Sequence, residues 1–320
     1  MYPIRLVILA VCALAAGAAH ADYPDRPVKI VVPYSPGGPA DLLGRYVAQK
    51  LSASLGQPFV VENKAGAGLV IGAEYVAKSA PDGYTLFVAA SSMLIDSGSR
   101  QRTPADNLKD FAPISLVGSF PLVLVANPSL PVHNVRETID YVKKRPGDVY
   151  YGSSGNGSLT HLAGELFGEM TGLKMVHVPY RGINEALTDI LANRVQFAFA
   201  GAPIALPQAK AGKVRALAVT SSTRTASAPE LPTIAEDGLP GYDVTPGYGI
   251  VAPAATPAPV IDKLHREIAK IIQGADVKER WTAWGADPTY SKSPQDFSAL
   301  MRAEAAKWTK LVGEGKIKLE

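Results

Sequence analysis

Two kinds of hydrophobic pattern alternate along the chain. Short apolar runs rich in β-branched residues predict strands, and they lie at residues 28–32, 59–61, 85–90, 122–126, 175–178, 195–200 and 214–219. Longer segments with apolar residues at helical spacing predict helices, and they lie at residues 39–55, 67–80, 135–144, 159–170, 183–192, 260–273 and 294–312. This alternation is typical of a parallel sheet covered by helices.

The pattern occurs in two successive units, followed by a helical tail. A chain of 320 residues has room for about two domains. Residues 229–259 are rich in Pro and Gly, and they read as a connection between units rather than as part of a core. We therefore expect two lobes with a cleft, and a ligand beyond the carboxyl ends of the strands.

Composition narrows the class of protein but not its function. The apolar fraction of 47% and the aromatic fraction of 8% exclude a mainly disordered chain, because enough surface can be buried. The net charge of +3 argues against a nucleic-acid platform, which would concentrate more Lys and Arg on one face.

The first 21 residues have the order of a secretory signal. Arg5 precedes an apolar run at residues 6–19, and Ala19-His20-Ala21 forms an A-x-A end. The 14 apolar residues would reach only about 21 Å as a helix, short of a bilayer core of about 30 Å. Lipidation at Cys12 is the alternative, but Val11 before it is not small. We expect cleavage after Ala21, which leaves a periplasmic chain without cysteine.

The first glycine-rich loop runs from Pro33 to Asp41 (PYSPGGPAD) and follows a predicted strand. Gly37 and Gly38 allow close approach to the backbone, and Pro39 at a helix start loses no intrahelical hydrogen bond. The free N–H groups and the positive end of the helix dipole favour an anion. A plain tight turn capped by Asp41 explains the motif equally well.

The second glycine-rich loop runs from Gly152 to Ser158 (GSSGNGS) and leads into the helix that holds His161. Its hydroxyls, its one amide side chain and its backbone N–H groups suit a carboxylate. Two structural readings stay open: Ser158 caps the helix, and His161 is a hydrogen-bonded helix residue. One loop supplies too little energy for tight binding, so we expect donors from both lobes and closure of the lobes around the ligand.

Known enzyme motifs do not fit these loops. The dinucleotide pattern G-x-G-x-x-G fails after Gly66 and after Gly155, and the nucleophile pattern G-x-S-x-G fails at Asn156. The histidines of the mature chain lack the spacing of zinc ligands, so we expect neither a metal nor a cofactor. A hydrolase that uses Ser158 as nucleophile and His161 as base is an unfavoured alternative.

Eight segments together resemble the extracytoplasmic substrate receptors of tripartite tricarboxylate transporters, also called the Bug family. These segments are residues 23–45 (YPDRPVKIVVPYSPGGPADLLGR), 61–87, 108–114, 151–167 (YGSSGNGSLTHLAGELF), 177–195, 213–221, 231–243 and 252–264. The resemblance implies an α/β fold, the two-lobed type II periplasmic binding protein fold with a cleft between the lobes. It further implies a signal peptide at 1–21, a first lobe made of 22–122 and 244–320, and a second lobe at 123–243.

The same resemblance implies a ligand, a partner and a set of binding residues. The ligand is a small organic carboxylate, held partly through ordered water, and the partner is a membrane permease. The residues carried over from the family are Tyr34, Ser35, Gly37, Gly38, Asp41, Ser91, Ser92, Ser153, Ser154, Asn156, Gly157, Ser158, His161, Tyr180, Arg181 and Asp189. Arg181 either clamps a carboxylate or pairs with Asp189, and we favour the pairing.

Three departures from the family pattern bear on the pocket. Leu69 and Val70 stand where the family commonly has Gly-Asn, Gly247 stands where a tryptophan is usual, and the stretch after Ser92 lacks an Asn-Pro turn. These changes predict a pocket for a bulkier or more apolar acid. We expect a monomeric receptor that is not an enzyme and binds no nucleic acid; a sensor role beside a membrane histidine kinase is the alternative to transport.

Overall fold

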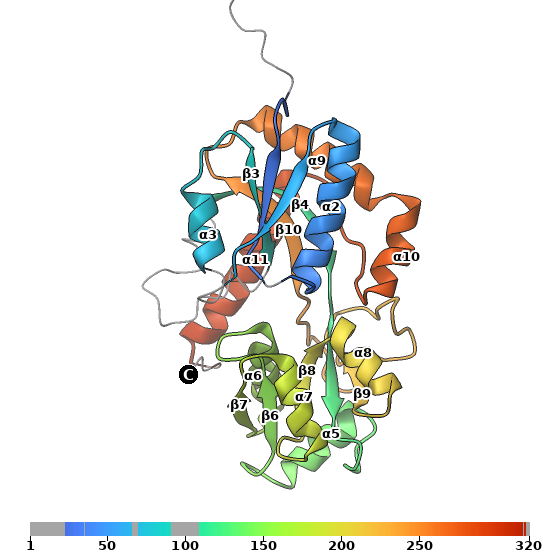
Figure 1. Cartoon of the computed structure of the whole chain (residues 1–320). Coiled ribbons are helices and arrows are strands. Elements are labelled where there is room, and N and C mark those ends of the chain that lie inside the picture. Colours follow the sequence, from blue (N-terminus) through green and yellow to red (C-terminus); the bar gives the residue numbers. More distant parts are fainter. Residues whose placement is uncertain (1–22, 35, 66–69, 91–108, 316, 318–320) are drawn as a thin grey trace, which may run out of the picture.

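Two mixed sheets, each covered by helices, form two lobes (Figure 1). The computed structural model describes residues 23–34, 36–65, 70–90, 109–315 and 317. The sheet of the first lobe has the order β2 (Phe59–Asn63), β1 (Val28–Val32), β3 (Thr85–Ala90), β10 (Gly247–Pro253) and β4 (Phe111–Ser119). The sheet of the second lobe has the order β7 (Val176–Pro179), β6 (Tyr150–Ser153), β8 (Phe197–Gly201), β5 (Leu122–Ala126) and β9 (Arg215–Val219). The two-lobed α/β fold that the sequence predicts is thereby confirmed.

Helices cover both faces of each sheet. In the first lobe, one face is covered by α2 (Pro39–Leu55), α9 (Ala258–Ile272) and α10 (Ala275–Ala283), and the other by α3 (Val70–Ala77) and α11 (Pro294–Gly313). In the second lobe, one core contains residues of α5 (Val135–Lys143) and α6 (Leu159–Thr171), and the other contains residues of α7 (Ile183–Leu191) and α8 (Ala202–Lys210). Each sheet is therefore shielded from water on its faces, and its strand ends carry the loops.

The expectation of a purely parallel sheet is wrong. Strands β1, β2 and β3 are parallel, as are β6, β7 and β8, but β10 runs antiparallel to β3 and β4. In the second lobe, β5 runs antiparallel to β8 and β9. Strands β5 and β10 are the ones that the chain enters on crossing from the other lobe, which reverses their direction.

The expectation that residues 229–259 only connect units is also wrong, because β10 lies between β3 and β4 inside the first sheet. Because β10 contains glycines, the sequence pattern did not indicate a strand there. At Gly249 an added Cβ would lie 2.1 Å from Phe297 Cζ, so this position must be glycine for α11 to pack on the strand. Helices α8 and α10 and strand β4 were not predicted either. For α8 the reason is its prolines, Pro203 near its start and Pro207 inside it, because proline normally argues against a helix.

The segments that cross between the lobes are hydrogen-bonded to neighbouring backbone, and one long helix packs on both lobes. The Phe120 N–H donates to the Pro246 carbonyl over 3.1 Å, and the Val244 N–H donates to the Thr220 carbonyl over 2.9 Å. Helix α11 buries Phe297 and Met301 in the first lobe and Trp308 in the second (Figure 1). The residue boundaries of the lobes stay a prediction.

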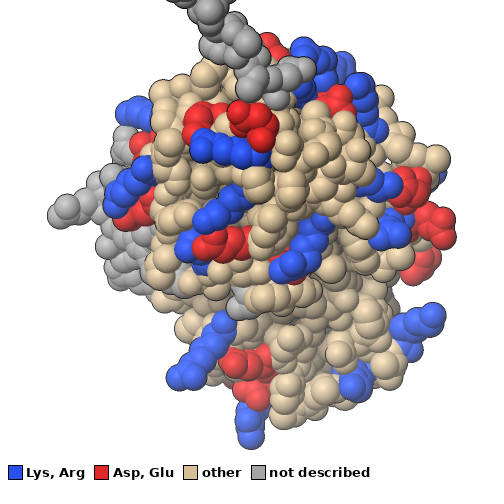
Figure 2. All heavy atoms as spheres, turned by 45° about the horizontal axis from the view of Figure 1, so that its top comes forward, with Lys and Arg blue, Asp and Glu red and all other residues tan. Residues whose placement is uncertain are grey.

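Charges of both signs alternate on the face seen in Figure 2, which looks onto the first lobe from above. Exposed ion pairs of the first lobe include Arg26–Asp82 at 2.9 Å and Lys50–Asp276 at 2.8 Å. Within the described residues, no helix is both long and apolar enough to cross a bilayer. The expected signal peptide lies outside the described residues.

Candidate functional site

The first glycine-rich loop is braced by the buried carboxylate of Asp41. This carboxylate accepts hydrogen bonds from the Gly37 N–H at 2.9 Å, from Arg45 Nε at 2.8 Å and from Asn63 Nδ2 at 2.8 Å. Burial alone would raise the pKa of Asp41, but the bonds from Arg45, Gly37 and Asn63 outweigh it and hold the pKa below its ordinary value. Asp41 therefore fixes the conformation of the loop, and both of its carboxylate oxygens are engaged in these hydrogen bonds.

One N–H group at the start of α2 stays open. Helix α2 begins at Pro39 after the extended Gly38, and its first turn has no intrahelical acceptor for its N–H groups. The Ala40 N–H has no hydrogen-bond partner in the described part of the chain. It lies at the positive end of the α2 dipole, where an anion is stabilised.

The start of α2 borders a cavity of about 580 Å³ between the lobes. Gly37, Gly38 and Pro39 line it from the first lobe, together with the end of α10, and α8 lines it from the second. The two lobes touch at its edge, since a Cβ on Gly285 would lie 3.0 Å from the Pro203 nitrogen. Lys210, at the end of α8, is the one described cation in the wall of this cavity, and it was not predicted.

The second glycine-rich loop uses most of its N–H groups internally. Its four bonds are Ser154 N–H to Thr160 Oγ1 at 2.8 Å, Gly155 N–H to Ser153 Oγ at 3.1 Å, Gly157 N–H to His161 Nδ1 at 3.1 Å and Ser158 N–H to the Gly155 carbonyl at 3.2 Å. Asn156 is exposed and Ser154 is half-buried. The loop therefore offers side chains, rather than a row of free amides, to a ligand.

A stack of two histidine rings lies beneath this loop. The ring centroids of His161 and His177 are 3.8 Å apart with an interplanar angle of 14°. His161 accepts the Gly157 N–H at Nδ1, so its own proton is on Nε2. Burial lowers the pKa of His161 to about 4, and burial together with His161 lowers that of His177 to about 4.

His177 was not predicted as a site residue. Its Nε2 lies 2.6 Å from Ser153 Oγ, and its position opposite Tyr151 comes from the pairing of β6 with β7. Ser153 is fully buried, which fits a structural hydrogen bond rather than a nucleophile. The spacing of the histidines along the sequence carried no sign of this pair, since only the strand register brings the rings together.

Ser158 and His161 do not form a nucleophile and base. The Ser158 hydroxyl donates to the Gly155 carbonyl at 2.6 Å and accepts the backbone N–H of His161 at 3.2 Å, as a helix N-cap does. The Nδ1 atom of His161 is taken by the Gly157 N–H, so the hydrolase alternative is contradicted. The structural readings of Ser158 as a cap and of His161 as a hydrogen-bonded helix residue agree with these contacts.

The expected ion pair between Arg181 and Asp189 is not formed among the described residues. Asp189 instead accepts from the Tyr180 hydroxyl at 2.8 Å and pairs with Arg194 at 3.1 Å. Arg181 is exposed, and its backbone N–H donates to Glu185 at 3.0 Å. Burial, with help from Asp189, raises the pKa of Tyr180 to about 12. The preferred pairing was wrong because Arg194 approaches Asp189 instead.

Strand pairing brings the second loop beside the start of α8, which lines the cavity; residues 152–158 themselves are not among the described residues that line it. Strand β6 lies beside β8 in parallel, with Gly152 opposite Ala198, so the second loop and the start of α8 share one edge of the sheet. Helix α8 in turn faces the first loop across the cavity. Tyr180 also adjoins the second loop, because its N–H donates to the Ser153 carbonyl at 3.1 Å. Ser35, Ser91, Ser92 and Leu69 lie outside the described residues.

The fold and the cavity between its lobes define a two-lobed periplasmic binding protein. The chain belongs to the family described as the tripartite tricarboxylate transporter family receptor, which it matches over residues 43–317. It is 37% identical to the protein BugT of Bordetella pertussis, over 98% of this chain and 97% of that protein. The resemblance seen in the sequence is thus confirmed.

Solved structures agree with this assignment. An R. palustris protein solved with adipate is 36% identical with a TM-score of 0.81, covering 92% of this chain and 99% of the other. MatC of Rhodopseudomonas palustris, solved with bound malate, is 29% identical with a TM-score of 0.76, covering 91% of this chain and 100% of the other. These relatives are solute-binding proteins rather than enzymes. Among the described residues, no cluster of three or more His, Cys, Asp or Glu side chains is placed to hold a metal ion.

Proposed function

We propose that the protein is an exported receptor, cleaved after Ala21, that binds a small organic carboxylate between its lobes and delivers it to a tripartite tricarboxylate permease. The observation that carries this proposal is the N-terminal end of α2, whose Gly37, Gly38 and Pro39 line the interlobe cavity. The adipate and malate bound by relatives support a carboxylate as the ligand.

The energy of binding has to come from several groups at once. A helix terminus contributes about 0.3–1 kcal/mol to an exposed anion and about 2 kcal/mol to a partly buried one. Micromolar affinity needs about 8 kcal/mol, so the N-terminus of α2 is not sufficient alone. Both loops bind the ligand in this proposal: the first through backbone N–H groups, the second through its remaining N–H groups and through Ser154 and Asn156. Closure of the lobes excludes water and strengthens each of these bonds.

A substitution at Gly38 tests the proposal. Gly38 has φ −83° and ψ 173°, a conformation that any residue adopts, so Gly38→Val adds a branched side chain at the N-terminus of α2 without backbone strain. We expect loss of carboxylate binding by calorimetry and a nearly unchanged melting temperature. Gly313→Val on the exposed end of α11 is the control, because a Cβ there meets nothing within 4 Å.

The opposite pattern would refute the proposal. If Gly38→Val binds malate or adipate as the wild type does, the first loop is not the carboxylate site. Capture of membrane proteins by the loaded receptor then separates the permease from a sensor-kinase ectodomain as its partner.

A further inference from the structure

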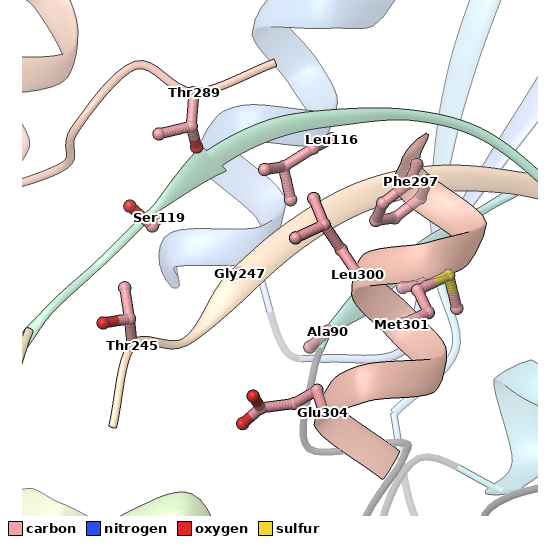
Figure 3. Close-up of a pocket in the computed structure, with 11 residues that line it drawn as sticks. Ala90, Leu116, Ser119, Thr245, Gly247, Thr289, Phe297, Leu300, Met301 and Glu304 are labelled. Carbon is pink, nitrogen blue, oxygen red and sulfur yellow. The ribbon is translucent and has the colours of Figure 1, made fainter. Parts of the chain in front are cut away.

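A second cavity, of about 200 Å³, lies on the α11 side of the first sheet (Figure 3). The ends of β3, β4 and β10 form its floor, and α11 forms its roof. Apolar side chains make most of its wall, chiefly Leu116, Phe297, Leu300 and Met301. It takes no part in the interlobe cavity described above.

Two glycines on β10 show that this space is not needed for packing. Gly247 and Gly249 project toward the same side of the strand, because alternate residues share a face. At Gly249, Phe297 fills the space, and an added Cβ would lie 2.1 Å from its Cζ. At Gly247, Leu116 Cδ1 is the one atom of the described residues within 4 Å of an added Cβ, at 3.3 Å. Gly249 is required by the core, whereas Gly247 leaves room that no described side chain occupies.

Two polar groups of the wall constrain what can enter. Thr289 Oγ1 is buried and has no hydrogen-bond partner among the described residues, which is an unfavourable state for a hydroxyl. The Glu304 carboxylate lies at the other end of the cavity, where one oxygen accepts the Trp308 Nε1–H at 2.6 Å (Figure 3). A carboxylate in the wall disfavours a second carboxylate beside it.

The cavity and the first loop lie at the same end of the first sheet, but the cavity is on the α11 face and the loop leads into α2 on the other face, so a ligand that joins them passes the strand ends. In the order β1, β3, β10, the start of β10 is two strands from the end of β1, or about 10 Å at the usual strand spacing. Ala90 pairs with Tyr248, so Gly247 lies at the same edge of the sheet as the loop. An apolar cavity of about 150 Å³ is known to bind benzene, so a phenyl ring fits in this one.

We propose that this cavity is the tail site of the receptor: it takes the ring or hydrocarbon end of a monocarboxylate whose acid group is bound at the first loop. Glu304 weakens the binding of acids with a second carboxylate at the far end. This inference rests on the proposed function for the acid group and adds the class of ligand.

The test uses a neutral ring and an acid with the same ring. Line broadening in 19F NMR spectra measures binding of fluorobenzene, and calorimetry compares 3-(4-fluorophenyl)propionate, propionate and adipate. Gly247→Leu fills the cavity, and Leu300→Trp fills it from α11 at a position that is 52% exposed, in case the first variant folds poorly. Gly313→Leu makes the same chemical change on the open surface.

We expect the 19F signal of fluorobenzene to broaden in the presence of the wild type and of Gly313→Leu. It should stay sharp in the presence of Gly247→Leu and Leu300→Trp. The wild type should bind 3-(4-fluorophenyl)propionate at least tenfold more tightly than propionate. The variants that fill the cavity should lose this difference in affinity. Glu304→Gln should strengthen adipate binding several-fold; an unchanged adipate affinity would refute the role of Glu304.

Two results separate the inference from the function on which it rests. If adipate binds but fluorobenzene does not, or the filled variants bind it equally, the tail site is refuted and the carboxylate receptor stands. If fluorobenzene behaves as expected and no carboxylate binds, the ring site stands and the proposed function is refuted.

Discussion

The loop before α2 and the loop before α6 both follow a parallel strand and lead into a helix, yet their hydrogen bonds differ. In the first, one carboxylate, Asp41, braces the loop, and the Ala40 N–H at the start of α2 has no partner among the described residues. In the second, side chains of the loop and of the first turn of α6 accept three backbone N–H groups, and the Gly155 carbonyl accepts a fourth. Similar glycine-rich sequences thus produce one loop that receives an anion through its backbone and one that presents side chains on a rigid frame.

The largest effect on the free energy of unfolding should come from lowering the pH, and it should arise at the histidines beneath the second loop. His161 and His177 have a pKa of about 4 in the fold against an ordinary value of 6.5. Between pH 6.5 and 4 the unfolded chain binds more protons than the folded one, so stability is full above pH 6.5 and falls as the pH drops to 4. The slope is about 1.4 kcal/mol per pH unit for each histidine, on the order of 3 kcal/mol in total for one of them.

Urea denaturation at pH 7, 5.5 and 4.5 measures this slope. His177→Phe should reduce it, and Asp41→Ala should leave the histidine contribution in place. A free energy of unfolding that is flat over this range would show that the ring stack is not buried as described.

Removing the brace of the first loop should have the next largest effect. Asp41→Ala leaves the Gly37 N–H and the Asn63 amide without their acceptor, at a cost of about 2 kcal/mol. The half-exposed Arg45 can turn to solvent, which limits the loss. Carboxylate affinity should fall together with stability. Asp41→Asn, which keeps an oxygen acceptor, is the control and should recover part of both.

Removing the hydroxyl beneath the second loop should cost somewhat less. Ser153→Ala takes away the partner of His177 and the acceptor for the Gly155 N–H, which we expect to cost about 1.5 kcal/mol in chemical denaturation. Ligand affinity should change only a little, since Ser153 is buried away from the cavity. A large loss of affinity with unchanged stability would reverse this assignment.

Removing the N-cap of α6 should have a still smaller effect on the stability of the protein. Ser158→Ala removes the acceptor for the His161 N–H and should destabilise the protein by about 1 kcal/mol. Ser158→Asp, which restores an N-cap oxygen, should recover it. Any turnover of an ester that disappears in Ser158→Ala would contradict the hydrogen bonds seen here.

The smallest effect should come from Lys210 on the far wall of the interlobe cavity. Lys210→Gln should weaken carboxylate binding a few-fold, because an exposed cation attracts the anion only weakly through water. The loss should shrink as salt is raised. An effect larger than that of Gly38→Val would mean that side-chain charge, and not the backbone, holds the acid.

Several helices and strands could be predicted from the sequence because residues at their own ends determine where they begin and end. Helix α2 begins at Pro39 and ends before the left-handed Gly56, as the sequence indicated, and β1, β3 and β5 have the predicted bounds. Strand β10 was missed because Gly249 serves a partner, Phe297, that is distant in the sequence. The pairing of His177 with Ser153 and the approach of Arg194 to Asp189 likewise depend on strand register and loop geometry, which no local pattern encodes.

Helix α11 has a consequence for how the molecule can be observed. Its indole at Trp308 is 1% exposed in the core of the second lobe, while Phe297 and Met301 fix the same helix to the first. Separation of the lobes must either bend this helix or draw the indole out toward water. With Trp281 and Trp284 of the first lobe replaced by Phe, the emission wavelength of Trp308 would therefore follow opening without any attached dye.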